Sequence, residues 1–123
     1  MRGYGLYASA DSAVLVLRAI HVVYADWCPH CVPATVEPMR RAAKELGVPC
    51  ILHDIDTDEV KNADELVKKY GDWTPDYLIP QVFLEMENGK IEHAMTGDPR
   101  GLQYTRMAVE TLKSTLAKRE EAR

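Results

Sequence analysis

Short apolar runs alternate with amphipathic segments along this chain. Four runs predict strands, because each is rich in β-branched or other apolar residues and is bounded by polar or turn-forming residues. They are Ile20–Ala25, Pro49–Ile55, Gln81–Met86 and Ile91–Met95. Asn88-Gly89 lies between the last two runs and is typical of a tight hairpin turn.

Segments with apolar residues three or four positions apart predict helices between these strands. They are Pro29–Leu46, Glu59–Tyr70 and a last helix that starts at Asp98-Pro99. Asp56-Thr57-Asp58 supplies cap residues for the second helix. Pro38 predicts a bend in the first, because proline has no N–H and its ring clashes inside a helix. The buried face of the last helix is predicted to hold Leu102, Val109, Leu112 and Leu116.

The two ends of the chain carry less regular patterns. Residues 1–19 form an N-terminal extension in which Ser9–Arg18 predicts a helix, while Val14–Leu17 suits a strand equally well. The tail Lys118–Arg123 holds only charged residues and alanine, so we expect it to fray.

The order of these elements is that of an α/β domain. Strand–helix alternation favours parallel pairing through crossover helices, and the hairpin adds an antiparallel edge. We therefore predict a central mixed sheet of about four strands with a C-terminal β-hairpin and helices on both faces. A chain of 123 residues fits one domain, residues 1–123.

Composition and charge narrow the class of partner. The formal net charge is −4 and no basic stretch stands out, so we expect no nucleic-acid partner and no membrane partner. The early apolar run Ala13–Leu17 is too short for a membrane span, and polar residues surround it too closely for a signal peptide. These features predict a cytoplasmic protein. Three cysteines do not make a disulfide framework.

Cys28 and Cys31, called the cysteine pair below, are the strongest candidates for chemistry. Cys28 would lie where a strand ends and a helix begins, and the unpaired N–H groups and dipole of a helix start stabilise a thiolate. Cys31 lies one turn further on, close enough to form a disulfide with Cys28. An attacking thiolate beside a thiol that resolves the mixed disulfide makes a redox catalyst that needs no cofactor and no metal.

The two residues between the cysteines are candidates for tuning the redox potential. Pro29 suits the first turn of a helix. A protonated His30 would stabilise the thiolate and the reduced form, which makes the disulfide a stronger oxidant. The alternative is that His30 is an exposed helical residue with little effect.

Other uses of the cysteines fit the spacing less well. A haem attachment motif needs histidine directly after the second cysteine, where this chain has Val32. A zinc ribbon needs a second pair, and only Cys50 remains. His21, His30 and Cys50 could complete a four-ligand site, but not at a common spacing. Cys50 itself is expected to be a buried inert thiol, with a peripheral redox switch as the alternative.

An ordered set of motifs resembles the thioredoxin superfamily over roughly Ile20 to Leu116. Ala25-Asp26-Trp27-Cys28 is similar to the family's approach to the active site. Tyr70-Gly71 followed by Ile79-Pro80 is similar to its cis-proline segment. The resemblance extends to the later turn and to the glycine before the last helix, in Asn88-Gly89-Lys90 and Thr96-Gly97.

The resemblance implies a thioredoxin fold and a role for each matching residue. Cys28 would attack and Cys31 would resolve. Pro80 would be cis, with an ordinary trans proline as the alternative, and the backbone of Ile79 would pair with an extended substrate segment. Trp27 would shield the site, unless it is a plain core aromatic.

The chain also departs from the family's pattern. The Pro-His pair between the cysteines resembles that of periplasmic disulfide oxidases, but the chain between Asp56 and Ile79 is too short for their helical insertion. Thioredoxins bury an aspartate six residues before the first cysteine and pair it with a lysine, where this chain has Val22 and Leu52. His21 or Asp26 could replace that proton acceptor, although Asp26 is expected at the surface.

The loop Asp72–Leu78 is longer than its thioredoxin equivalent and carries Trp73 and Tyr77. One hypothesis makes Trp73 part of a substrate lip. The other packs both aromatics on the domain's own core.

These observations favour a monomeric thiol–disulfide oxidoreductase that acts on protein disulfides or thiols and exchanges electrons with an upstream reductase or oxidant. Two alternatives stay open. One is a glutaredoxin-like reductase of glutathione mixed disulfides, and the other is a non-enzymatic module that binds a partner or a metal through its thiols.

Overall fold

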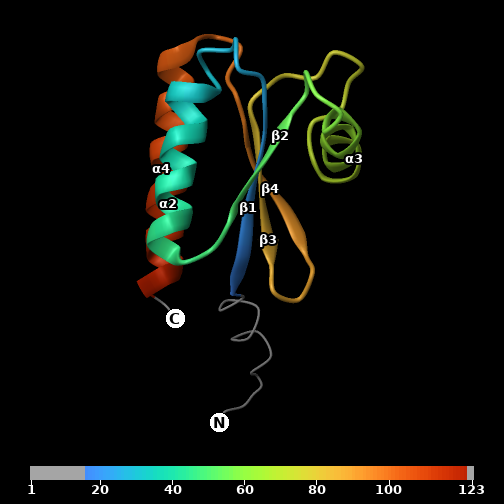
Figure 1. Ribbon diagram of the computed structural model, residues 1–123. Helices are drawn as coiled ribbons and strands as arrows, with labels where there is room; N and C mark the ends of the chain where they lie inside the picture. The colour runs from blue at the N-terminus through green and yellow to red at the C-terminus, as the bar shows by residue number, and fades with distance from the viewer. Residues whose placement is uncertain (1–15, 122–123) are drawn as a thin grey trace.

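The computed structural model describes residues 16–121 and has an α/β architecture (Figure 1). The elements follow one another as β1 (Leu17–Tyr24), the π-helix η1 (Val32–Val36), α2 (Glu37–Leu46), β2 (Cys50–Asp54), α3 (Val60–Tyr70), β3 (Gln81–Met86), β4 (Ile91–Thr96) and α4 (Leu102–Glu121). The predicted α/β class is confirmed.

The four strands form one mixed sheet in the order β2-β1-β3-β4. β1 and β2 are parallel, and Val22 lies opposite Leu52 in their register. The other two neighbouring pairs are antiparallel, so β3 runs against β1 as well as against β4. A tight turn joins β3 to β4, in which the Gly89 N–H donates to the Met86 carbonyl at 2.9 Å. Since α4 follows this strand pair, the structure does not show the C-terminal hairpin that we expected.

Helices lie on both faces of the sheet. Figure 1 shows α2 and α4 side by side against one face, with α3 on the opposite side. The larger core lies between the sheet and the helices α2 and α4. Its buried members include Ile20, Val22, Met39, Leu84, Val109, Leu112 and Leu116. A smaller cluster under α3 contains Val23, Ala63, Val67 and Phe83.

The first predicted helix is divided. A turn over residues 28–31 leads into η1, and regular α-helix begins only at Glu37. In η1 the Val36 N–H donates to the Cys31 carbonyl at 2.7 Å, five residues back. Pro38 has no N–H, and its ring would clash with the carbonyl four residues before it, so a widened turn ahead of it relieves the clash. The predicted bend at Pro38 is therefore a π-helical segment just before it.

Both ends differ from the prediction. Leu17 and Arg18 belong to β1 and not to a helix, because they extend the strand that pairs with β3. The rest of the predicted helix Ser9–Arg18 lies mostly outside the described residues. The predicted start of the last helix at Asp98-Pro99 is a turn instead, and the helix begins at Leu102. The tail that we expected to fray is helical to Glu121, and the last two residues lie outside the described range.

Within residues 16–121, no helix combines the length and the apolar stretch that crossing a membrane requires.

Candidate functional site

The cysteine pair lies just beyond the carboxyl end of β1. The Cys28 N–H donates to the Ala25 carbonyl at 3.2 Å, which turns the chain away from the sheet. The Cys28 carbonyl then accepts from the N–H groups of Cys31 at 2.9 Å and Val32 at 3.2 Å. Helical hydrogen bonding therefore begins at Cys28, although the π-helix η1 begins at Val32 and α2 at Glu37, both later than the predicted Pro29.

The two cysteines are free thiols in unequal surroundings. Cys31 is fully buried, whereas Cys28 retains 6% of its exposed surface. Burial, followed by a hydrogen bond with the Cys28 side chain, raises the pKa of the Cys31 thiol well above its ordinary value. Because a thiolate and not a thiol is the nucleophile, this asymmetry suits Cys31 to the second of two steps.

Ile79 packs against the cluster formed by Ala25 and the cysteine pair. The Ile79–Pro80 peptide bond is cis, as expected from the resemblance. Gly97 brings the chain after β4 up to this bond, where its N–H donates to the Pro80 carbonyl at 2.7 Å. A Cβ on Gly97 would lie 2.6 Å from the Pro80 Cδ, so only glycine allows this approach.

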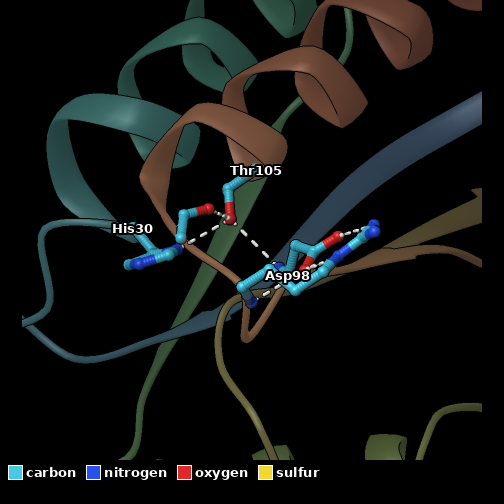
Figure 2. Close-up of polar contacts among 5 residues, drawn as sticks. His30, Asp98 and Thr105 are labelled. Atoms are coloured by element: carbon cyan, nitrogen blue, oxygen red, sulfur yellow. Dashed lines mark hydrogen bonds and ion pairs between the residues drawn. The ribbon is translucent and has the colours of Figure 1, made fainter.

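His30 is half-buried and hydrogen-bonded at both its ring and its backbone. Its Nδ1 lies 2.7 Å from the Thr105 Oγ1 of α4. Its carbonyl accepts a hydrogen bond of 2.7 Å from the Thr35 hydroxyl. His30 is therefore neither exposed nor helical, because it lies half-buried in a turn and contacts a distant helix (Figure 2).

Thr105 is a functional candidate that the sequence analysis missed. It is fully buried and lies on the same face of α4 as Val109 and Leu112. A polar residue at that position of an otherwise apolar helical face was the available signal, because a buried hydroxyl needs a hydrogen-bond partner.

Trp27 is 69% exposed, so the alternative of a core aromatic is wrong. Its indole Nε1–H donates to the Asp56 carboxylate at 2.9 Å. This bond fixes the ring next to the cysteine turn and holds it against the loop that follows β2.

Trp73 makes its contacts on the α3 side of the molecule. Its ring packs on Tyr77, with 5.5 Å between centroids, and the Lys68 ammonium lies 4.7 Å from the ring centre. Tyr77 in turn donates a hydrogen bond of 2.7 Å to Asp64 of α3. These contacts favour packing on the domain over a substrate lip.

The position of the family's buried aspartate is apolar here. Val22 is fully buried in the larger core, opposite Leu52. Asp26 is exposed, as expected. His21 lies on the opposite face of β1 from Val22, hydrogen-bonded to His53 and Glu85. Val22, Asp26 and His21 therefore do not place a carboxylate in the core between the sheet and α2.

Cys50 is the first residue of β2, pairs with Ile20 and is half-buried, whereas we expected it to be buried. Burial raises the pKa of its thiol to about 11, against an opposing effect of the nearby Arg40. This environment favours the inert thiol over the redox switch, since little thiolate is present near neutral pH.

In the described part of the chain, no group of three or more histidine, cysteine, aspartate or glutamate side chains is arranged to hold a metal ion. The three-residue set of His21, His30 and Cys50 is therefore not brought together around the cysteine pair.

Comparisons with protein-family models, with curated proteins and with solved structures find no match to this chain.

Proposed function

We propose that this protein is a thiol–disulfide oxidoreductase that acts on protein disulfides through Cys28 and Cys31. The observation that carries the proposal is the joint placement of the two free thiols, one slightly exposed and one buried, at the start of helical hydrogen bonding after β1. Two cysteines at this spacing can form a disulfide and can be reopened by exchange.

The reaction transfers two electrons in two exchanges. The Cys28 thiolate attacks one sulfur of a substrate disulfide, which forms a mixed disulfide and releases the other substrate sulfur as a thiolate. Cys31 then gives its proton to the substrate thiolate released in the first exchange and attacks the Cys28 sulfur, which releases the second substrate thiolate and leaves a Cys28–Cys31 disulfide. An external dithiol reductant would restore the cysteine pair, and an external oxidant would drive the sequence in reverse.

We further infer a thioredoxin-like fold and a relationship to that superfamily. Support comes from the strand–turn–helix context of the cysteine pair and from the packing of Ile79 beside it, before the cis Pro80. In this proposal an extended substrate segment lies along the Ile79 backbone, next to the exposed Trp27. A cytoplasmic location belongs to the same proposal, because three cysteines do not make the structural disulfide framework that is typical of small secreted domains.

The first test is a redox titration of the purified protein against glutathione buffers. Trapping of free thiols by alkylation counts the oxidised cysteines, and Trp27 fluorescence in a Trp73→Phe background reports the local change. We expect one reversible two-electron transition. A midpoint near about −270 mV would make the protein a reductase, and one towards about −120 mV would make it an oxidant.

Three single substitutions locate the chemistry. Cys28→Ser should abolish the transition and the reduction of a protein disulfide. Cys31→Ser should retain attack but accumulate the mixed disulfide, and Cys50→Ser should behave as the parent protein. No reversible transition in the parent protein would exclude the proposal and favour a thiol-binding module, whereas preferential turnover of a glutathione mixed disulfide would favour the glutaredoxin-like alternative.

A further inference from the structure

The cysteine turn is tied to the far end of the sequence by one buried hydroxyl group. Thr105 is the fourth residue of α4, 75 positions after His30, and its Oγ1 lies 2.7 Å from the His30 Nδ1. The same Oγ1 accepts the Asp98 N–H at 3.0 Å. Figure 2 shows this hydroxyl between the histidine ring and the segment that leads into α4.

The Thr105 hydroxyl can hold a neutral His30 ring in either tautomer. The hydroxyl has one proton to give, and its two acceptors are the His30 Nδ1 at 2.7 Å and the Gly101 carbonyl at 3.5 Å. When Nδ1 is unprotonated, the hydroxyl donates to it. When Nδ1 carries the proton, Nδ1–H donates to Oγ1 and the hydroxyl turns to the Gly101 carbonyl.

The same hydroxyl can also serve a protonated His30. Nδ1–H then donates to Oγ1, and the hydroxyl proton turns to the Gly101 carbonyl. Every group keeps a partner in both states, so the ring can gain or lose its proton without losing its anchor. A valine at this position would offer neither a donor nor an acceptor.

Charged groups near this ring come from two segments. Asp98 belongs to the turn before α4, and hydrogen bonds from Arg100 hold the pKa of its carboxyl down to about 2, with a smaller contribution from His30. Arg100 is held in that pair at 2.8 Å. The cysteine pair lies on the same turn as His30. The ring therefore lies near a carboxylate that stays ionised and belongs to the same turn as the thiols.

We propose that Thr105 is a positioning residue that fixes the His30 ring by its Nδ1 and thereby raises the redox potential of the cysteine pair. This proposal rests on the proposed function. A fixed, protonated imidazole stabilises the reduced thiolate form, which makes the disulfide a stronger oxidant. Without its anchor, the ring would spread over other rotamers and lose that effect.

The first experiment needs no redox activity. Long-range ¹H–¹⁵N correlation spectra of the wild-type protein, at a pH where His30 is neutral, report which ring nitrogen is protonated. We expect one dominant tautomer in the wild type and a mixture of tautomers in Thr105→Val. Identical His30 spectra in the two proteins would overturn the proposal whether or not the protein is an oxidoreductase.

The second experiment measures the glutathione equilibrium of the cysteine pair. Thr105→Val should shift the equilibrium constant towards the reductant by about tenfold, which is about 30 mV for two electrons. His30→Ala should shift it in the same direction, and the double variant should equal His30→Ala, because Thr105 acts through the ring. Thr105→Ser should restore the wild-type value.

Thr111→Val is the matched control, because this exposed threonine of α4 donates only to the Met107 carbonyl of its own helix. Thr105→Ala removes the hydroxyl without a second methyl group and replaces the valine variant if that protein does not fold. A wild-type titration with unchanged potentials in both variants would overturn this inference alone, whereas the absence of any transition in the wild type would overturn the proposed function.

Discussion

Neighbouring residues of β1 meet two different environments. Val22 points into the core under α2 and α4, where Leu84, Met86 and Leu116 are also buried. His21 points to the side that carries α3 and lies 2.9 Å from the ring of His53. The same strand thus supplies an apolar layer on one face. On the other face, His21 joins a polar layer of His21, His53 and Glu85, which lies on the side of the smaller apolar cluster that contains Val23.

When His21 is neutral, the hydrogen bonds of the polar layer determine which ring nitrogen of each histidine carries the proton. The Glu85 carboxylate accepts from the His21 Nε2–H at 2.7 Å, so the neutral His21 presents an unprotonated Nδ1 to His53. His53 must then donate from Nε2, and its Nδ1 is left without a hydrogen-bond partner, 3.8 Å from the nearer Glu59 oxygen. Each further proton on this face changes a charge inside the fold, whereas the described buried residues of the apolar core include no histidine and no carboxylate.

The largest expected effect is a difference in stability between two variants. Each variant places one carboxylate on one of the two faces of the sheet. Val22→Asp would bury a charge among apolar side chains with no partner, and we expect the free energy of unfolding to fall by about 3–5 kcal/mol. Ile51→Asp is the matched control on the other face. Ile51 is 38% exposed and lies beside His21 in the register of β1 and β2, so we expect a loss of about 1 kcal/mol or less.

Chemical denaturation of both variants at pH 7 measures the difference. Equal losses would mean that the two faces do not differ in their tolerance of charge. A stable Val22→Asp protein would also show that this position can hold the buried acid that the thioredoxin resemblance implies.

A smaller effect is expected from pH, and its origin is the polar face. Burial, and then the neighbouring His21, lowers the pKa of His53 below its ordinary 6.5. Hydrogen bonds from His21 and Arg18 lower the pKa of Glu85 below its ordinary 4.5. In both cases the unfolded chain binds more protons than the folded one, so stability falls as pH decreases, first through about 6.5 and then through about 4.5.

Urea unfolding between pH 7.5 and 5 checks the first of these two losses. His53→Gln keeps a donor for His21 but cannot titrate, so its stability should change less over this range than that of the wild type. His93→Gln is the control, since His93 belongs to β4 and bonds to Thr96. If the free energy of unfolding of His53→Gln depends on pH as strongly as that of the wild type, the group that titrates is not His53.

The sequence predicted those helices and strands whose ends are set by neighbouring residues, such as a proline, a turn or a cap. β3 occupies Gln81–Met86 as predicted, because an apolar run follows Pro80 and ends at the polar turn before Gly89. α3 begins one residue later than predicted, at Val60. The cysteine pair was found the same way, since its spacing and its place after a strand are both local.

Long-range contacts decided what the sequence could not predict. Arg18 belongs to β1 although it precedes the apolar run, and it is held there by an ion pair with Glu85. The partner of His30 is 75 positions away, and the two histidines of the polar layer come from different strands. No helical or strand period marks such pairs, because each residue is unremarkable within its own segment.

The smallest expected effect concerns Trp73 and decides whether the side of α3 also takes part in substrate binding. Trp73 is 39% exposed and packs on Tyr77, which Asp64 holds to α3. Trp73→Ala should lower the free energy of unfolding by about 1 kcal/mol, because it removes one aromatic contact and a partly exposed cation–π pair. The rate of protein-disulfide reduction should stay unchanged, since the contacts of this ring lie within the domain.

Trp27→Ala is the matched comparison. It removes a more exposed tryptophan next to the cysteine turn and should slow reduction with little loss of stability. A slower reaction in Trp73→Ala at unchanged stability would make the loop a substrate lip after all, and would extend the functional surface from the cysteine turn to the face that carries α3.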